Sequence, residues 1–161
     1  MTKLSERREW FDNNSSEISQ GVRKLFKRIS RVSCPCCGYP TLTERGLYGI
    51  CELCNWEDDG QDDEDSHRRS GPNNGYSLDL ARKNFSKYLT MYSPDNNPTI
   101  GREGSRQRPQ LKKQLISVFE QLVESTGKER DRLWLTAFGI ERKLYHELKK
   151  SIKKYEQSLT S

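Results

Sequence analysis

Two C-x-x-C pairs constrain this chain more than any other feature of its sequence. The four cysteines, with thirteen residues between the inner two, are Cys34 and Cys37, then Cys51 and Cys54. Zinc takes four ligands at the corners of a tetrahedron, and a C-x-x-C turn supplies two adjacent corners. Gly38 and Asn55 follow the pairs, and both residue types tolerate the positive φ that such a turn needs. The sequence therefore predicts one structural Zn²⁺ bound by four cysteines.

The segment between the pairs favours two short strands. Residues 41–43 and 47–50 carry apolar and β-branched side chains on either side of the turn at Arg45 and Gly46. Two cysteine knuckles joined by a β-hairpin make a zinc ribbon. We therefore expect an α+β fold with a small zinc-ribbon-like β-hairpin core, flanking α-helices and a predominantly helical C-terminal region.

Apolar periodicity and turn residues divide the chain into four predicted parts. These are an N-terminal extension with an amphipathic helix (1–32), a cysteine-rich domain (33–91), a linker (92–109) and a helical hairpin (110–161). The amphipathic helix is expected at residues 15–30. A second helix is expected after Ser77, which is placed to cap it. Gly139 is a candidate position for a kink in the hairpin.

The sequence leaves open other roles for the cysteines besides binding zinc. "CPCC" resembles a thioredoxin-type redox pair, but Gly38 and Pro40 disfavour the helix start that such a site needs. A disulfide scaffold fits poorly with five cysteines. We interpret Cys36 as a small packing residue, with an oxidation-sensitive thiol and a ligand exchange as alternatives. His67 is a weaker alternative ligand.

Composition limits the class of protein. Hydrophobic residues make up 32% and charged residues also 32%, which is little apolar material for a core. The sequence contains neither an apolar stretch long enough to span a membrane nor the apolar middle of a secretory signal. We therefore expect a cytoplasmic protein that does not bind membranes. Clustered cysteines in a reducing compartment favour metal binding over disulfides.

Charge is distributed unevenly along the chain. Residues 52–65 ("ELCNWEDDGQDDED") hold eight acidic residues and no Lys or Arg, whereas the rest of the chain has a balance of +13. We expect the end of this segment to form either a solvated loop or a docking surface for a basic partner. Its acidic residues are Asp62, Asp63, Glu64 and Asp65.

Three stretches, "CPCCGYPTL", "YGICELCNWEDDG" and "GPNNGYSLDLARKNF", closely resemble the cysteine-rich CPCC family of small bacterial and phage proteins. The resemblance covers about residues 34–88. It implies a zinc-ribbon-like core and suggests a role in bacterial conflict, such as immunity to a toxin. It does not imply an active site, and the helical extensions on both sides depart from the family pattern.

These observations favour a non-catalytic zinc-binding protein that interacts with and neutralises a protein partner, a toxin or effector. The alternative is a nucleic-acid-binding zinc ribbon, because basic residues crowd 102–113 and 142–154. The chain lacks a P-loop, a dinucleotide motif and a Ser-His-Asp arrangement. A zinc ion with four cysteine ligands has no open position for chemistry. We therefore expect no enzymatic activity.

Overall fold

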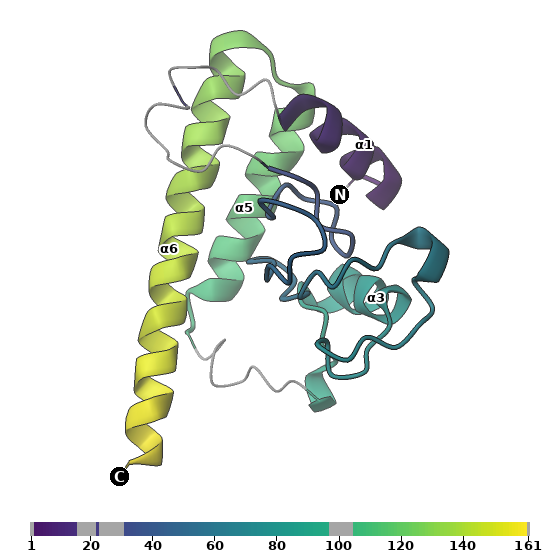
Figure 1. The fold of residues 1–161 in the computed structure, drawn as a ribbon. Helices are drawn as coiled ribbons and strands as arrows, with labels where there is room; N and C mark the ends of the chain where they lie inside the picture. Colours follow the sequence, from purple (N-terminus) through teal and green to yellow (C-terminus); the bar gives the residue numbers. More distant parts are fainter. Residues whose placement is uncertain (1, 16–21, 23–30, 97–104, 161) are drawn as a thin grey trace.

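The computed structural model describes residues 2–15, 22, 31–96 and 105–160 (Figure 1). Within these ranges the α-helices are α1 (Leu4–Asn14), α3 (Leu78–Tyr88), α5 (Arg108–Glu124) and α6 (Gly127–Leu159). Two short 3₁₀ turns, η2 (Asp63–Asp65) and η3 (Pro94–Asn96), complete the regular structure. The helix predicted at 15–30 lies almost entirely outside the described residues.

The two C-terminal helices form an antiparallel pair. Figure 1 shows α5 beside the first half of α6, with the second half of α6 extending past the start of α5. Leu115, Phe119 and Leu122 of α5 are fully buried, as are Ala137 and Leu144 of α6. These spacings of three, four and seven residues place one apolar face of each helix against the other. Helix α6 continues through the predicted kink position without a break.

The predicted α+β fold with a zinc-ribbon-like β-hairpin core is wrong. Between residues 31 and 96 the structure contains no strand, and its only β-pairings are isolated bridges (Val32 with Leu42, Ile50 with Glu57, and Arg69 with Ser77). The two segments predicted to pair with each other each pair instead across their own cysteine turn. The fold is therefore a set of helices around irregular cysteine-bearing loops.

Local backbone geometry explains why the strands do not form. Gly46 and Tyr48 have φ values of +72° and +58°, in the left-handed region that interrupts an extended chain. The carboxylate of Asp58 accepts hydrogen bonds from the Gly46 N–H (2.8 Å) and from Arg45 Nε (2.9 Å). A buried side chain thus takes the place that a neighbouring strand would have filled.

Helix α3 begins where the sequence predicts. The Ser77 hydroxyl accepts a hydrogen bond from the Leu80 N–H (3.3 Å) and caps the helix. Arg82 of α3 donates to the carbonyl oxygen of Pro35 (3.0 Å). This contact holds α3 against the first cysteine turn.

One aromatic cluster joins the cysteine loops to the helices. The Tyr39 ring stacks on Phe119 of α5 with centroids 5.6 Å apart, and Phe11 of α1 meets Phe119 edge-on at 5.7 Å. Trp134 of α6 lies 6.3 Å from Phe119. All four rings are buried. Because the four segments share one core, α1, α5 and α6 support the cysteine turns directly.

Candidate metal centre

The two C-x-x-C segments fold into turns with the same backbone hydrogen bonds. In the first, the Gly38 N–H donates to the Cys34 carbonyl (2.8 Å) and the Cys34 N–H to the Tyr39 carbonyl (2.9 Å). In the second, the Asn55 N–H donates to Cys51 (2.9 Å) and the Cys51 N–H to Trp56 (2.9 Å). Each turn therefore presents its two cysteine side chains on the same side of the backbone.

The predicted positive φ angles are confirmed. Gly38 has φ +76° and Asn55 has φ +68°. Glycine and asparagine adopt this region at lower cost than other residues. The residue types that follow the second cysteine of each pair are thus required by the turns that the cysteines form.

The turns bring four sulfur atoms together. The Sγ atoms of Cys34, Cys37, Cys51 and Cys54 all lie within 4.8 Å of one another. The closest contacts, Cys34 to Cys54 and Cys37 to Cys51, are both 3.6 Å. A tetrahedral centre with zinc–sulfur bonds near 2.3 Å has sulfur–sulfur edges of about 3.8 Å. The cluster has the size of a tetrathiolate metal site, and its spacing is much too long for disulfide bonds.

The four thiols lie in an apolar environment with no solvent exposure. Burial raises the pKa of Cys34, Cys37 and Cys54 above the usual thiol range. Burial also acts upward on Cys51, but hydrogen bonds from the other three thiols and from the Cys54 N–H outweigh it and lower that pKa. Four buried thiolates repel one another, so a bound cation is needed to hold them all in the charged form.

Several groups donate hydrogen bonds toward the sulfurs. The N–H groups of Cys54 and Trp56 approach the sulfurs of Cys51 (3.4 Å) and Cys54 (3.5 Å). The Thr41 hydroxyl lies 2.9 Å from Cys51 Sγ. Such contacts around a metal site orient its ligands and tune their basicity. The role of Thr41 was missed from the sequence, where this residue is assigned to a strand.

Cys36 lies outside the four-sulfur group and is buried, with 2% of its surface exposed. It occupies the third position of its turn, which corresponds to Leu53 in the second turn, and Leu53 is fully buried. The packing interpretation of Cys36 is consistent with this correspondence. His67 is exposed and is not part of the cluster.

An arginine of α1 supports the first turn from outside. Arg7 Nε donates to the carbonyl oxygen of Cys37 (3.1 Å), and its guanidinium lies over the Tyr39 ring at 4.8 Å. Its Nη1 also donates to the Thr2 carbonyl. The sequence gives no local signal for this contact, because Arg7 lies thirty positions before Cys37.

The acidic segment is held by arginines of the same chain. Asp62 forms ion pairs with Arg8 of α1 (2.8 Å) and Arg45 (2.9 Å). Asp63 contacts Arg8 (3.2 Å) and Arg82 of α3 (2.6 Å). The other two residues of the predicted docking surface make no such ion pairs among the described residues. Asp65 accepts a hydrogen bond from the Asp62 N–H (2.9 Å), and Glu64 is exposed. Asp62 and Asp63 thus connect α1, α3 and the turn at Arg45.

Comparison with known proteins agrees with these motifs. Residues 32–97, which contain both cysteine turns and α3, match the family model described as "Cysteine-rich CPCC". Over these residues, called the CPCC region below, the chain is similar to the cysteine-rich CPCC family. The resemblance drawn from the sequence is confirmed. Helices α1, α5 and α6 lie outside the CPCC region, although they share its core. No curated protein and no solved structure matches the chain.

Among the described residues, no helix combines the length and the apolar composition needed to cross a bilayer.

Proposed function

We propose that the CPCC region holds one structural Zn²⁺ through Cys34, Cys37, Cys51 and Cys54. The observation that carries the proposal is the convergence of four fully buried sulfurs within 4.8 Å from two turns of the same shape. An all-thiolate tetrahedral set suits zinc or iron, and a closed four-ligand site is typical of structural zinc. Zinc in this site would cross-link the two turns, which have no strand pairing between them.

Elemental analysis of the purified full-length protein tests the proposal. We expect one zinc per chain, and no zinc in Cys51→Ser. Cys36→Ala is the matched control, because it removes a buried thiol of the same segment that lies outside the cluster. Iron in place of zinc would give visible absorption. A metal-free protein that stays fully folded would contradict the structural role.

We further propose that the zinc-stabilised chain is a non-catalytic binding protein whose partner is a toxin or effector that it neutralises. A closed tetrathiolate site offers no open coordination position, which supports a structural rather than a catalytic role. The CPCC resemblance motivates the choice of partner. The ion pairs of Asp62 and Asp63 compensate the charges of these two acidic residues, so they weaken the attraction of the segment for a basic partner.

Co-expression with the product of the adjacent gene tests this role. The chain should restore the growth of cells that the adjacent gene product inhibits, and it should co-purify with that product. Glu64→Lys tests the acidic segment cleanly, because Glu64 has no ion pair among the described residues, whereas changes at Asp62 also break internal contacts. Unchanged protection by Glu64→Lys would remove this surface from the mechanism. Lack of protection by the wild-type chain would contradict the neutralising role.

A further inference from the structure

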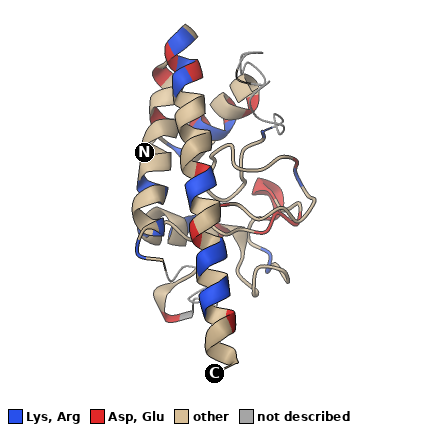
Figure 2. Ribbon diagram, turned by 90° about the vertical axis from the view of Figure 1, so that its left-hand side faces the viewer, with Lys and Arg blue, Asp and Glu red and all other residues tan. Residues whose placement is uncertain are grey.

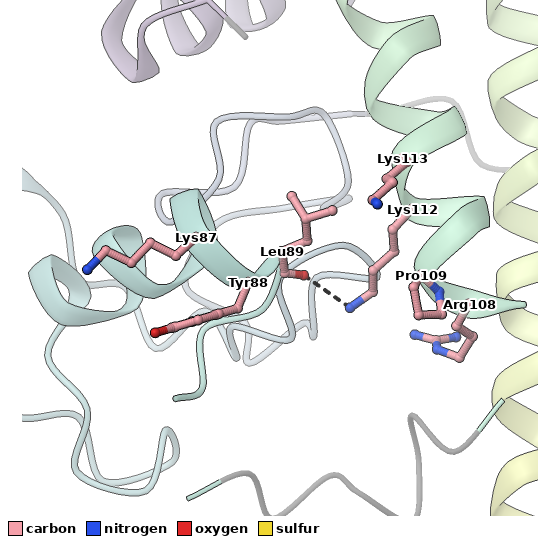
Figure 3. Close-up of a pocket in the computed structure, with 7 residues that line it drawn as sticks. All are labelled: Lys87, Tyr88, Leu89, Arg108, Pro109, Lys112 and Lys113. Atoms are coloured by element: carbon pink, nitrogen blue, oxygen red, sulfur yellow. Dashed lines mark hydrogen bonds between the residues drawn. The ribbon is translucent and has the colours of Figure 1, made fainter. Parts of the chain in front are cut away.

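A cavity of about 270 Å³ lies between the end of α3 and the start of α5 (Figure 3). Residues 87–89 line one side, and Arg108, Pro109, Lys112 and Lys113 line the other. Four of these side chains are cationic and none is acidic. The cavity lies outside the metal centre and shares no residue with it. Its lining indicates an anionic ligand.

Two of the cations are buried. Arg108 is 2% exposed and Lys112 is 4% exposed, whereas Lys113 is exposed at the rim. Figure 3 shows the Lys112 amine directed toward the Leu89 carbonyl oxygen, to which it donates at 3.2 Å, and the Lys87 amine directed away from α5. Buried cations are costly unless an anion compensates them. The cavity therefore places Arg108 where a bound anion would reduce that cost.

The existing compensation of Arg108 is incomplete. Its Nη1 donates to the Leu144 carbonyl (2.6 Å), and its Nη2 lies 3.9 Å from the Glu52 carboxylate, which is beyond hydrogen-bond distance. Its Nε is buried and has no hydrogen-bond partner among the described residues. One donor of a buried guanidinium is thus left unused.

The start of α5 adds to the positive character of the cavity. The helix begins at Arg108, its N-cap residue Gln107 makes no side-chain capping bond, and its first turn contains no acidic residue. Pro109 in the first turn has no N–H, but the other N–H groups at the start of a helix lack intrahelical partners, and the helix dipole favours an anion beside them. Proteins bind phosphate groups at helix starts for this reason.

We propose that this cavity binds the phosphate group of a small phosphate monoester. A monoester phosphate is close to dianionic at neutral pH and has three terminal oxygens, which suits several donors at once. The volume is several times the ~30 Å³ of a water molecule, so it leaves room for part of the ester group. A terminal phosphate can reach recessed cations, whereas an internal phosphodiester of a nucleic acid is held away from them by its two neighbouring nucleotides.

Isothermal titration calorimetry on the full-length protein tests the proposal with three probes. These are inorganic phosphate, ribose 5-phosphate and a single-stranded oligonucleotide without terminal phosphates. We expect saturable binding of the first two, tighter for ribose 5-phosphate, and weak binding of the third at the same salt concentration. Absence of saturable binding of both small probes up to about 10 mM would overturn the proposal. Oligonucleotide binding as tight as that of ribose 5-phosphate would instead indicate a nucleic-acid surface.

Variants of the lining residues locate the site. Lys112→Met keeps the length of the side chain and should weaken ribose 5-phosphate binding about tenfold or more. Lys113→Glu reverses a charge at an exposed position on the rim of the cavity, so the protein should fold normally. Its affinity for ribose 5-phosphate should be at least several-fold lower. The matched control is Lys153→Ala at an exposed position of α6, which should bind like the wild type. Figure 2 shows several Lys and Arg positions along α6 toward its C-terminus.

Measurements of folding and of metal content distinguish a failure of this proposal from a failure of the proposed metal centre. Circular dichroism establishes whether each variant is folded, and if Lys112→Met does not fold, the exposed Lys113→Glu variant decides the question. Unchanged affinity in folded Lys113→Glu would place any phosphate binding elsewhere. Metal content should be normal in every lining variant. A protein with normal metal content and no phosphate binding would contradict only the anion cavity.

Discussion

Gly38 and Asn55 stand at the same place in two turns of the same shape, and Gly38 is also closed in by helix α1. Both residues have positive φ, and both donate their N–H to the first cysteine of their turn. A Cβ atom on Gly38 would lie 2.9 Å from Leu4 Cδ1 and 3.2 Å from Arg7 Nε. Helix α1 therefore packs so closely on the first turn that a side chain has no room there.

Gly38→Ala should lower the free energy of unfolding by about 1–3 kcal/mol, because it adds backbone strain to a steric contact with α1. Asn55→Gly is the matched control. It keeps the positive φ accessible and loses the hydrogen bond from Asn55 Nδ2 to Thr90 Oγ1, so it should cost no more than about 1 kcal/mol. Urea denaturation of the metal-loaded protein measures both changes. Equal stability of the two variants would contradict the steric role of α1.

The turns could be predicted from sequence because their determinants are local. Cysteine spacing and the following Gly38 or Asn55 together specify the geometry within six residues. The β-hairpin could not be predicted correctly, because its formation depends on which segments pair. Asp58, buried and bonded to Arg45 and Gly46, decides that pairing from outside both predicted strands.

Helix α1 was missed for a different physical reason. Of its residues only Arg7 and Phe11 are buried, so it lacks the apolar stripe by which amphipathic helices are identified. It is held by polar contacts instead. The Asp12 carboxylate accepts from the N–H (2.9 Å) and hydroxyl (2.8 Å) of Ser33, which directly precedes the first turn. Such long-range polar contacts leave no periodic pattern in a sequence.

Arg31, which lies three residues before Cys34 of the first turn, forms a bidentate ion pair with Glu141 of α6. The paired distances are 2.7 and 2.6 Å, and both side chains are less than 15% exposed. The Arg31 guanidinium also lies 4.9 Å from the centroid of the Phe138 ring. Charge-assisted bidentate pairs of low exposure are stronger than surface pairs.

A double-mutant cycle with Arg31→Met and Glu141→Gln should give a coupling energy of about 1–3 kcal/mol. The Met side chain retains the apolar contact with Phe138, so the cycle isolates the ion pair. Thermal or urea unfolding supplies the four stabilities. Additive effects of the two changes would show that the pair contributes nothing beyond its separate side chains.

Asp62 should make stability depend on acid pH. Burial acts to raise its pKa, but hydrogen bonds from Arg45, the Asp63 N–H and Arg8 prevail and lower the pKa below the usual aspartate value. A lowered folded-state pKa means that the stabilisation is present above the unfolded-state pKa, near 4, and is lost as pH falls through the folded-state value. Because the Asp62 side chain is 38% exposed, solvent screens its ion pairs and the effect should be modest.

Asp62→Asn should therefore be less stable than the wild type at pH 7, and the difference should shrink below about pH 4. Glu64→Gln is the matched control, since its carboxylate is exposed and makes no ion pair among the described residues. Denaturant titrations at several pH values measure the difference. A constant difference across this range would contradict an electrostatic contribution from Asp62.

The Tyr39 hydroxyl connects the first cysteine turn to α5. It donates to Glu120 Oε1 at 2.7 Å, and Glu120 also accepts from the Thr2 N–H at 2.8 Å. Burial, followed by this hydrogen bond, raises the Tyr39 pKa well above its usual range. Burial pushes the Glu120 pKa upward, but the bonds from Tyr39 and Thr2 outweigh it and lower that pKa.

Tyr39→Phe keeps the ring stacked on Phe119 and removes only the hydroxyl. It should lower the free energy of unfolding by about 1–3 kcal/mol at pH 7, because it takes a donor from a carboxylate. Since the folded-state pKa of Glu120 is lowered, this loss should be largest above the ordinary glutamate pKa and should fade in acid. Metal content should not change, because the hydroxyl bonds to Glu120 on α5 rather than to a sulfur. Loss of metal in folded Tyr39→Phe would show instead that the contact with α5 is needed to keep the first turn in its metal-binding shape.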